Sequence, residues 1–239
     1  MKYSKIIAMI PARIGSTRLK MKNLALIDGK PMIYYTIKAA QDSGAFDRII
    51  LNSDSKVFEE IAKRYGVEFY HRPDELGSST TKSDDVVLDF MQNNPCDIVA
   101  WVNPTSPLQT GGEVKKVIDY FQLEALDSLI TVENKLVHTA WQNRPINFVE
   151  DGKFAQTQDL IPVQPFVYSI MMWRLVPFVE AMEVKGYAFF TGKVGFYPVS
   201  KETGIIIKTA EDLRLIDYIV RSRGENEEIL YDPIVEKIE

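Results

Sequence analysis

Two kinds of hydrophobic pattern alternate along the first half of the chain. Short runs of consecutive apolar residues predict buried strands, and these lie over residues 5–10, 48–53, 67–70, 98–102 and 128–132. Between them, apolar residues recur every three or four positions, which predicts amphipathic helices. These helices are expected over residues 31–44, 58–66, 84–91 and 114–121. The pattern resumes near the end, with a predicted strand over 194–199 and a helix face over 213–220.

This alternation limits the folds that the chain can adopt. Parallel strands need long crossover connections, which are almost always right-handed and which place helices on the faces of the sheet. We therefore expect an α/β fold with a doubly wound, mostly parallel, Rossmann-like sheet. The sequence contains neither G-x-G-x-x-G nor G-x-x-x-x-G-K-[ST]. No dinucleotide fingerprint or P-loop therefore supports this fold.

The regular pattern lapses between residue 133 and about residue 187. This stretch is rich in Gln, Asn, Pro and aromatic residues, and it is too hydrophobic to be disordered. We expect one domain over residues 1–239, in which residues 134–190 form an insertion. The insertion would cover the site or make a subunit contact.

Composition and charge exclude several classes of function. The formal net charge of -5 argues against a nucleic-acid partner or an anionic membrane partner. A single cysteine, Cys96, excludes an internal disulfide and a cysteine-based zinc site. No apolar run approaches the length of a membrane span, and no signal-peptide pattern is present. We therefore expect a cytoplasmic protein without a membrane partner.

A cationic loop follows the first predicted strand and reverses the overall charge of the chain locally. Its cations are Arg13, Arg18, Lys20 and Lys22. Between them, Gly15 and Ser16 would let backbone N–H groups approach an anion. Because open α/β sheets bind ligands beyond the carboxyl ends of their strands, this loop is a candidate phosphate site. An ordinary solvated basic turn is the alternative.

Two further polar loops follow predicted strands. Residues 72–83 contain Arg72 and many hydroxyl side chains, and residues 103–108 place Thr and Ser between two prolines. Parallel strands share a direction, so all of these loops should face one crevice. The alternatives are a helix cap before residue 84 and a tight strand-to-helix connection after residue 102.

At this point the chain resembles the acylneuraminate cytidylyltransferase family. The motifs that carry the resemblance are PARIGSTRLKMKN at 11–23, RPDEL at 72–76 and NPTSPL at 103–108, within residues 5–132. The resemblance implies an α/β nucleotidyltransferase that transfers CMP from CTP to a 2-keto-sugar acid and releases pyrophosphate. It also implies that the insertion is a dimerisation element, and thus a homodimer.

The resemblance further implies roles for individual residues. Arg13 and Lys22 would be catalytic and would stabilise the CTP phosphates. The residues implied to bind the nucleotide are Ala12, Arg13, Gly15, Ser16, Arg18, Lys22, Asn23, Arg72 and Ser83. The sugar acid would contact Asn103, Thr105 and Gln109.

The expected Mg²⁺ cofactor is less well supported, because Ile206 and Lys208 occupy the positions where the family carries its two metal-binding aspartates. A lysine cannot ligate a hard cation. Three alternatives stay open: Lys208 supplies positive charge itself, the substrate phosphates hold the metal with another carboxylate such as Asp212, or transfer is lost. The last case would make the chain a degenerate nucleotide-binding relative with a regulatory or assembly role.

Overall fold

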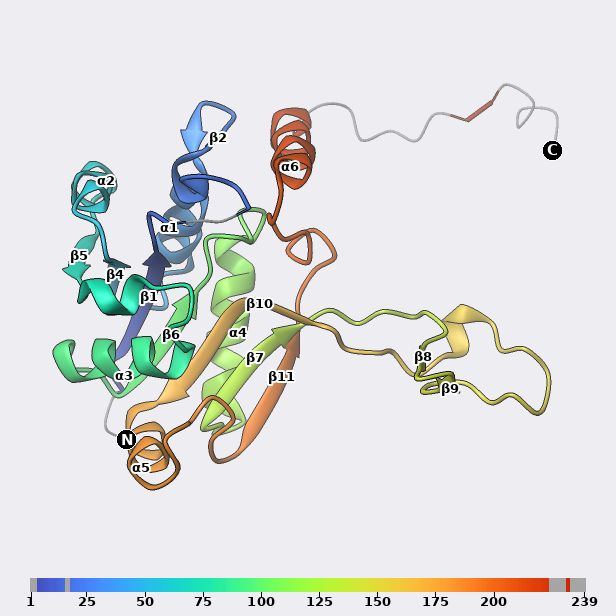
Figure 1. Cartoon of the computed structure of the whole chain (residues 1–239). Helices are drawn as coiled ribbons and strands as arrows, with labels where there is room; N and C mark the ends of the chain where they lie inside the picture. Colours follow the sequence, from blue (N-terminus) through green and yellow to red (C-terminus); the bar gives the residue numbers. More distant parts are fainter. Residues whose placement is uncertain (1–3, 16–17, 224–230, 233–239) are drawn as a thin grey trace.

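A sheet of seven strands runs through the centre of the molecule, with helices on both of its faces (Figure 1). The computed structural model describes residues 4–15, 18–223 and 231–232. In chain order the strands of this sheet are β1 (Ile6–Ala12), β4 (Arg48–Ser53), β5 (Glu68–His71), β6 (Ile98–Val102), β7 (Ser128–Val132), β10 (Phe166–Arg174) and β11 (Val194–Pro198). Across the sheet their order is β11-β7-β10-β6-β1-β4-β5. The paired neighbours are parallel, except that β10 is antiparallel to both β6 and β7.

Helices and short hairpins complete the architecture. The α-helices are α1 (Met32–Ser43), α2 (Val57–Tyr65), α3 (Ser83–Asn93), α4 (Gly111–Leu123), α5 (Leu175–Lys185) and α6 (Ala210–Ser222). The 3-10 helices are η1 (Lys22–Leu24), η2 (Asp74–Gly77) and η3 (Thr157–Asp159). Two hairpins pair β2 (Leu26–Ile27) with β3 (Lys30–Pro31), and β8 (Ala140–Trp141) with β9 (Arg144–Pro145).

The central strand β1 shows why the apolar runs are continuous. Ala8 and Ile10 pack into the core that α1, α2 and α4 cover, whereas Ile7 and Met9 pack into the core under α3 and α5. All four side chains are fully buried. A strand that is buried on both faces has no polar side to alternate with its apolar side. The predicted doubly wound, mostly parallel sheet is confirmed.

The predicted ends of the first two helices, at Gly44 and Gly66, are also confirmed. Pro31 immediately precedes α1, and Gly44 ends this helix with a φ of 58°. Gly66 ends α2 in the same way, with a φ of 67°. Glycine adopts this left-handed conformation without the steric cost that a Cβ atom would add. The two glycines therefore fix where the chain turns back into the next strand.

Sequence analysis missed β10 and α5, which both lie inside the predicted insertion. The β10 strand lies between β6 and β7 in the middle of the sheet. Its register shifts between Phe166 and Met171, and Tyr168 has a φ of 58°. This irregularity hides the strand in the sequence, because it shortens the continuous apolar run that a strand buried on both faces would otherwise show. Residues 166–185 thus belong to the folded core rather than to an insertion.

The part that leaves the core is an arm formed by residues 134–165. Figure 1 shows it extending away from the sheet between β7 and β10. At its base, Lys135 and Val163 exchange backbone hydrogen bonds of 2.9 and 3.0 Å. Its dimerisation role stays a prediction.

A third, smaller core lies beside the carboxyl end of β1. It joins the β2–β3 hairpin to α6 through the buried side chains of Ile27, Ile207 and Ile216. The backbone N–H of Asp28 also donates to Asp217 Oδ1 over 2.7 Å. This packing brings the C-terminal segment against the cationic loop. In the described part of the chain, no helix has the length and apolar character needed to cross a membrane.

Candidate functional site

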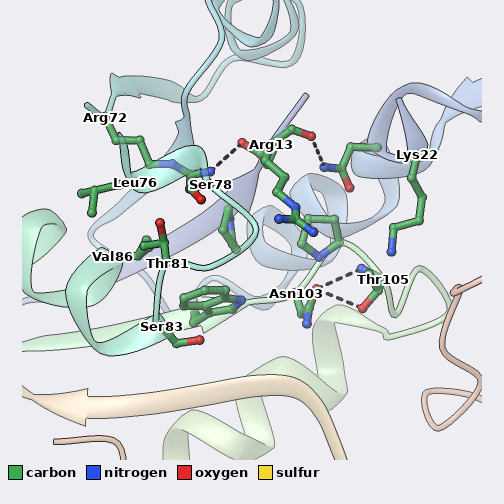
Figure 2. Close-up of a pocket in the computed structure, with 15 residues that line it drawn as sticks. Arg13, Lys22, Arg72, Leu76, Ser78, Thr81, Ser83, Val86, Asn103 and Thr105 are labelled. Atoms are coloured by element: carbon green, nitrogen blue, oxygen red, sulfur yellow. Dashed lines mark hydrogen bonds between the residues drawn. The ribbon is translucent and has the colours of Figure 1, made fainter. Parts of the chain in front are cut away.

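A cleft opens at the carboxyl ends of β1, β5 and β6, where the three polar loops converge (Figure 2). In this view Lys22, Asn103 and Thr105 lie on one side of the cleft, and Arg72 and Leu76 lie on the other. The residues that line it are Pro11, Ala12, Arg13, Lys22, Asn23, Arg72, Leu76, Ser78, Thr81, Ser83, Val86, Trp101, Asn103, Pro104 and Thr105. The expected common crevice is therefore present.

The loop after β1 is held by hydrogen bonds within itself and to the residue that follows β4. Asn23 is buried and donates through Nδ2 to the carbonyl oxygen of Arg13 over 3.5 Å, and the N–H of Ile14 donates to Asp54 Oδ1 over 3.4 Å. Gly15 and Arg18 are not among the residues that line the cleft, and a Cβ atom at Gly15 would meet nothing within 4 Å. Packing against the described residues thus does not require glycine there.

The two serines predicted to bind the nucleotide, Ser16 and Ser83, differ in what the structure describes. Ser16 lies outside the described residues. Ser83 lines the cleft at the first residue of α3.

Lys22 connects the loop to the far end of the chain. Its Nζ donates to the carbonyl oxygen of Ile207 over 3.0 Å. Burial lowers the pKa of the Lys22 ammonium, and the charges of Arg18, Arg13 and Lys208 lower it further, against the effect of Asp212. Like charges are therefore concentrated at this end of the cleft, which favours an anionic ligand.

Arg72 is a buried cation on the opposite side, with 4% of its surface exposed. It makes long contacts, of 3.5 Å to the carbonyl oxygen of Ala12 and 3.6 Å to Asp54 Oδ1. Its Nε has no hydrogen-bond partner among the described residues. Burial lowers the pKa of Arg72, while Asp54 raises it. A buried donor without a partner is costly, so this side of the cleft suits a ligand that offers an acceptor.

The side of the cleft around Arg72 is otherwise apolar with a hydroxyl rim. Leu76, Val86 and Trp101 supply the apolar surface, and Ser78 and Thr81 supply hydroxyl groups. Sequence analysis missed Trp101 because it reads as one more apolar residue of a buried strand. Its position two residues before Asn103, at the end of β6, is the signal that could have identified it. Such a surface suits a flat ring with polar edges.

The turn after β6 holds its side chains in place internally. Asn103 Oδ1 accepts hydrogen bonds from the backbone N–H and the hydroxyl of Thr105, over 3.2 and 3.0 Å. Gln109 is buried, and its Nε2 donates to Ser169 Oγ over 3.0 Å. Gln109 is not among the described residues that line the cleft, and its contact with substrate stays a prediction. Its amide satisfies a polar group of β10 inside the core.

The donor set does not fit a metal ion held by the protein. No Asp or Glu is among the described residues that line the cleft, and the same part of the chain contains no group of three His, Cys, Asp or Glu that could hold an ion. Asp54 contacts Arg72, and Asp212 Oδ2 accepts from the backbone N–H groups of Lys208 and Thr209 over 2.8 Å each. Mg²⁺ requires oxygen ligands, so the residues present do not match the expected cofactor.

A family model and several known proteins match this chain. A family model described as cytidylyltransferase matches residues 7–214. An N-acylneuraminate cytidylyltransferase of Streptococcus agalactiae serotype V is 29% identical over 238 residues, which cover 92% of this chain and 55% of that protein. A CMP-N,N'-diacetyllegionaminic acid synthase of Legionella pneumophila is 32% identical over 143 residues, covering 57% of this chain and 61% of that protein.

A solved structure supports the fold independently. The structure of a CMP:2-keto-3-deoxy-manno-octonic acid synthetase complexed with CTP superposes with a TM-score of 0.68 and 17% sequence identity. The match covers 92% of this chain and 99% of the other. The chain spans about half the length of the Streptococcus agalactiae protein that it matches.

Proposed function

Because this chain belongs to the cytidylyltransferase family, we propose that it transfers a cytidylyl group from CTP to a 2-keto-sugar acid. The sugar hydroxyl oxygen bonds to the α-phosphorus of CTP and releases its proton to solvent. The bond from that phosphorus to the oxygen that bridges to the β-phosphate breaks, and pyrophosphate leaves with the electron pair. The relatives compared above carry the names of such enzymes, which favours transfer over a degenerate, non-catalytic role.

The observation that carries this proposal is the concentration of cations at one end of the cleft. Arg13 and Lys22 line it, and Arg18 and Lys208 are close enough to lower the pKa of Lys22. Negative charge accumulates on the phosphate oxygens as pyrophosphate leaves. Fixed cations stabilise this charge without reorganisation of solvent. We therefore assign Arg13 and Lys22 as catalytic residues that contact the phosphates.

The opposite side of the cleft fits the cytosine ring. Cytosine presents a carbonyl oxygen and a ring nitrogen as adjacent acceptors. The Nε of Arg72 is a buried donor without a partner among the described residues, and Ala12 and Ser83 line the same cleft. We assign Asn103 and Thr105, which also line the cleft, to contacts with the sugar acid.

The test is a measurement of pyrophosphate release with CTP and a panel of 2-keto-sugar acids, compared with ATP, GTP and UTP. We expect release with CTP and at least one acid, and loss of release in Arg13→Gln. CTP binding without turnover across the panel would contradict the transferase assignment. Absence of CTP binding would contradict the nucleotide site itself.

We also propose a homodimer formed through the arm of residues 134–165, in the cytoplasm, where CTP is available. The arm exposes large apolar side chains: Leu136, Val137, Trp141, Ile146, Val149, Phe154 and Ile161. Exposed apolar surface of this extent is typical of a protein interface. A second copy of the chain would supply matching apolar surface.

A further inference from the structure

The segment around Lys208 is tied to two different loops on the side of the cleft where Lys22 lies. The N–H of Ile207 donates to the carbonyl oxygen of Thr105 over 2.9 Å. The carbonyl oxygen of Ile207 accepts from Lys22 Nζ over 3.0 Å. Two lining residues from different loops thus hold the backbone next to Lys208, which lies at the rim of the cleft.

The Lys208 side chain is exposed and makes no ion pair within the described ranges 4–15, 18–223 and 231–232. The adjacent carboxylate, Asp212, is already engaged at the start of α6. Its Oδ2 accepts from the N–H groups of Lys208 and Thr209 and from the Thr209 hydroxyl. Asp212 offsets part of the charge of Lys208, but no described carboxylate forms an ion pair with it, so Lys208 still adds positive charge to that of Arg13 and Lys22.

We propose that Lys208 binds the nucleotide phosphates and replaces, with its own charge, a divalent ion held by the protein. This inference rests on the proposed function, because it assumes that the anion in the cleft is the triphosphate of CTP. It follows that free CTP binds at least as tightly as its Mg²⁺ complex. Mg²⁺ neutralises part of the negative charge of CTP and so weakens its attraction to the cations of the cleft. No carboxylate among the described lining residues could regain this binding energy by coordinating the ion.

The first experiment is calorimetric titration of the whole protein with CTP in EDTA and in excess Mg²⁺. We expect the affinity in EDTA to equal or exceed the affinity in Mg²⁺. Tighter binding in Mg²⁺ would overturn the inference but would leave the proposed function intact. Failure to bind CTP under both conditions would instead contradict the proposed function.

The second experiment uses Lys208→Met, which removes the charge but keeps most of the side-chain length. We expect a loss of CTP affinity of about 10-fold, which is typical of one charge-assisted contact. The matched control is Lys201→Met, an exposed lysine in the preceding loop, whose affinity should not change. Equal affinities of the two variants would overturn the role of Lys208.

The third experiment tests whether carboxylates at positions 206 and 208 make Mg²⁺ strengthen CTP binding. The double variant Ile206→Asp with Lys208→Asp places two carboxylates at the same rim. We expect CTP to bind this variant more tightly in Mg²⁺ than in EDTA, opposite to the wild-type chain. If Mg²⁺ fails to strengthen CTP binding in a folded double variant, then the segment does not face the phosphates and the inference is wrong.

Discussion

The cleft and the arm are both incomplete in the single chain, but they lack different things. The cleft is cationic and suits an anion: Lys22 lies among other cations, and the buried Nε of Arg72 has no partner among the described residues. The arm lacks apolar cover, with Phe154 79% exposed and Ile161 77% exposed. Charged hydrogen bonds are directional and specify a small ligand, whereas apolar burial scales with area and suits a broad surface. A substitution that weakens CTP binding in the cleft should therefore leave dimerisation unchanged, and a substitution in the arm should leave CTP binding unchanged.

The largest expected effect removes the cations from the cleft. In the double variant Arg13→Gln with Lys22→Met, each lost charge-assisted contact is worth about 1.5–3 kcal/mol. We expect CTP affinity to fall by roughly 10³-fold in calorimetry, which corresponds to the loss of two such contacts. The oligomeric state should not change.

The control for this double variant is Lys20→Met. Lys20 is an exposed lysine of the same loop that does not line the cleft. It should bind CTP as the wild-type chain does. A similar loss in Lys20→Met would mean that general electrostatic attraction, rather than the geometry of the cleft, determines affinity.

The second prediction disrupts the arm. Trp141 lies on β8 and is 65% exposed. Burying a large apolar side chain contributes roughly 1.5–3 kcal/mol, so Trp141→Ser should weaken dimerisation by about 10- to 100-fold in analytical ultracentrifugation. CTP affinity should stay constant. The control is Tyr218→Ser, which removes an exposed aromatic side chain from α6. Dimers that are equally stable in both variants would place the interface elsewhere.

The parallel strands and the position of the cleft could be predicted from the sequence. The parallel strands were predictable because burial on both faces makes their apolar runs continuous, as in β1 and β6. The cleft was predictable because parallel strands end on the same side of a sheet, which brings Arg13, Arg72 and Asn103 together. In both cases the information is local in the sequence.

Other features could not be predicted because they depend on distant contacts. The β10 strand is irregular between Phe166 and Met171 and pairs with strands far away in the sequence. Lys22 and Ile207 are 185 positions apart, and no local pattern indicates their contact. Gln109 follows a cleft-lining motif, but only the packed core shows that its side chain points toward Ser169.

The third prediction concerns pH and is specific to the cleft. The pKa of Lys22 is lowered from its ordinary value of 10.5, first by burial and then by neighbouring cations. Lys22 therefore loses its charge at a lower pH than an exposed lysine, and CTP affinity should fall as the pH rises through that lowered pKa. We expect the decline to approach about 10-fold, the contribution of one charged contact.

Calorimetry at increasing alkaline pH, with Lys22→Arg as the comparison, checks this expectation. An arginine at position 22 stays protonated throughout the accessible range, so the decline should be much smaller. An identical decline in both proteins would assign the titration to another group. Dimerisation should show no such dependence, since the exposed arm contributes apolar side chains.

The smallest expected effect concerns the start of α6. It distinguishes a helix that stabilises the cleft from one that itself contributes to CTP binding. Thr209 Oγ1 accepts from the N–H of Asp212 over 3.3 Å, and Asp212 in turn accepts from Thr209, which forms a capping box. Thr209→Val should cost about 1 kcal/mol, a decrease in Tm of roughly 2–4 °C, while Thr209→Ser should be nearly neutral. CTP affinity should fall by no more than a few-fold, because Thr105 and Lys22 still hold the backbone of Ile207. Loss of CTP binding in a folded Thr209→Val protein would show that the start of α6 belongs to the site itself.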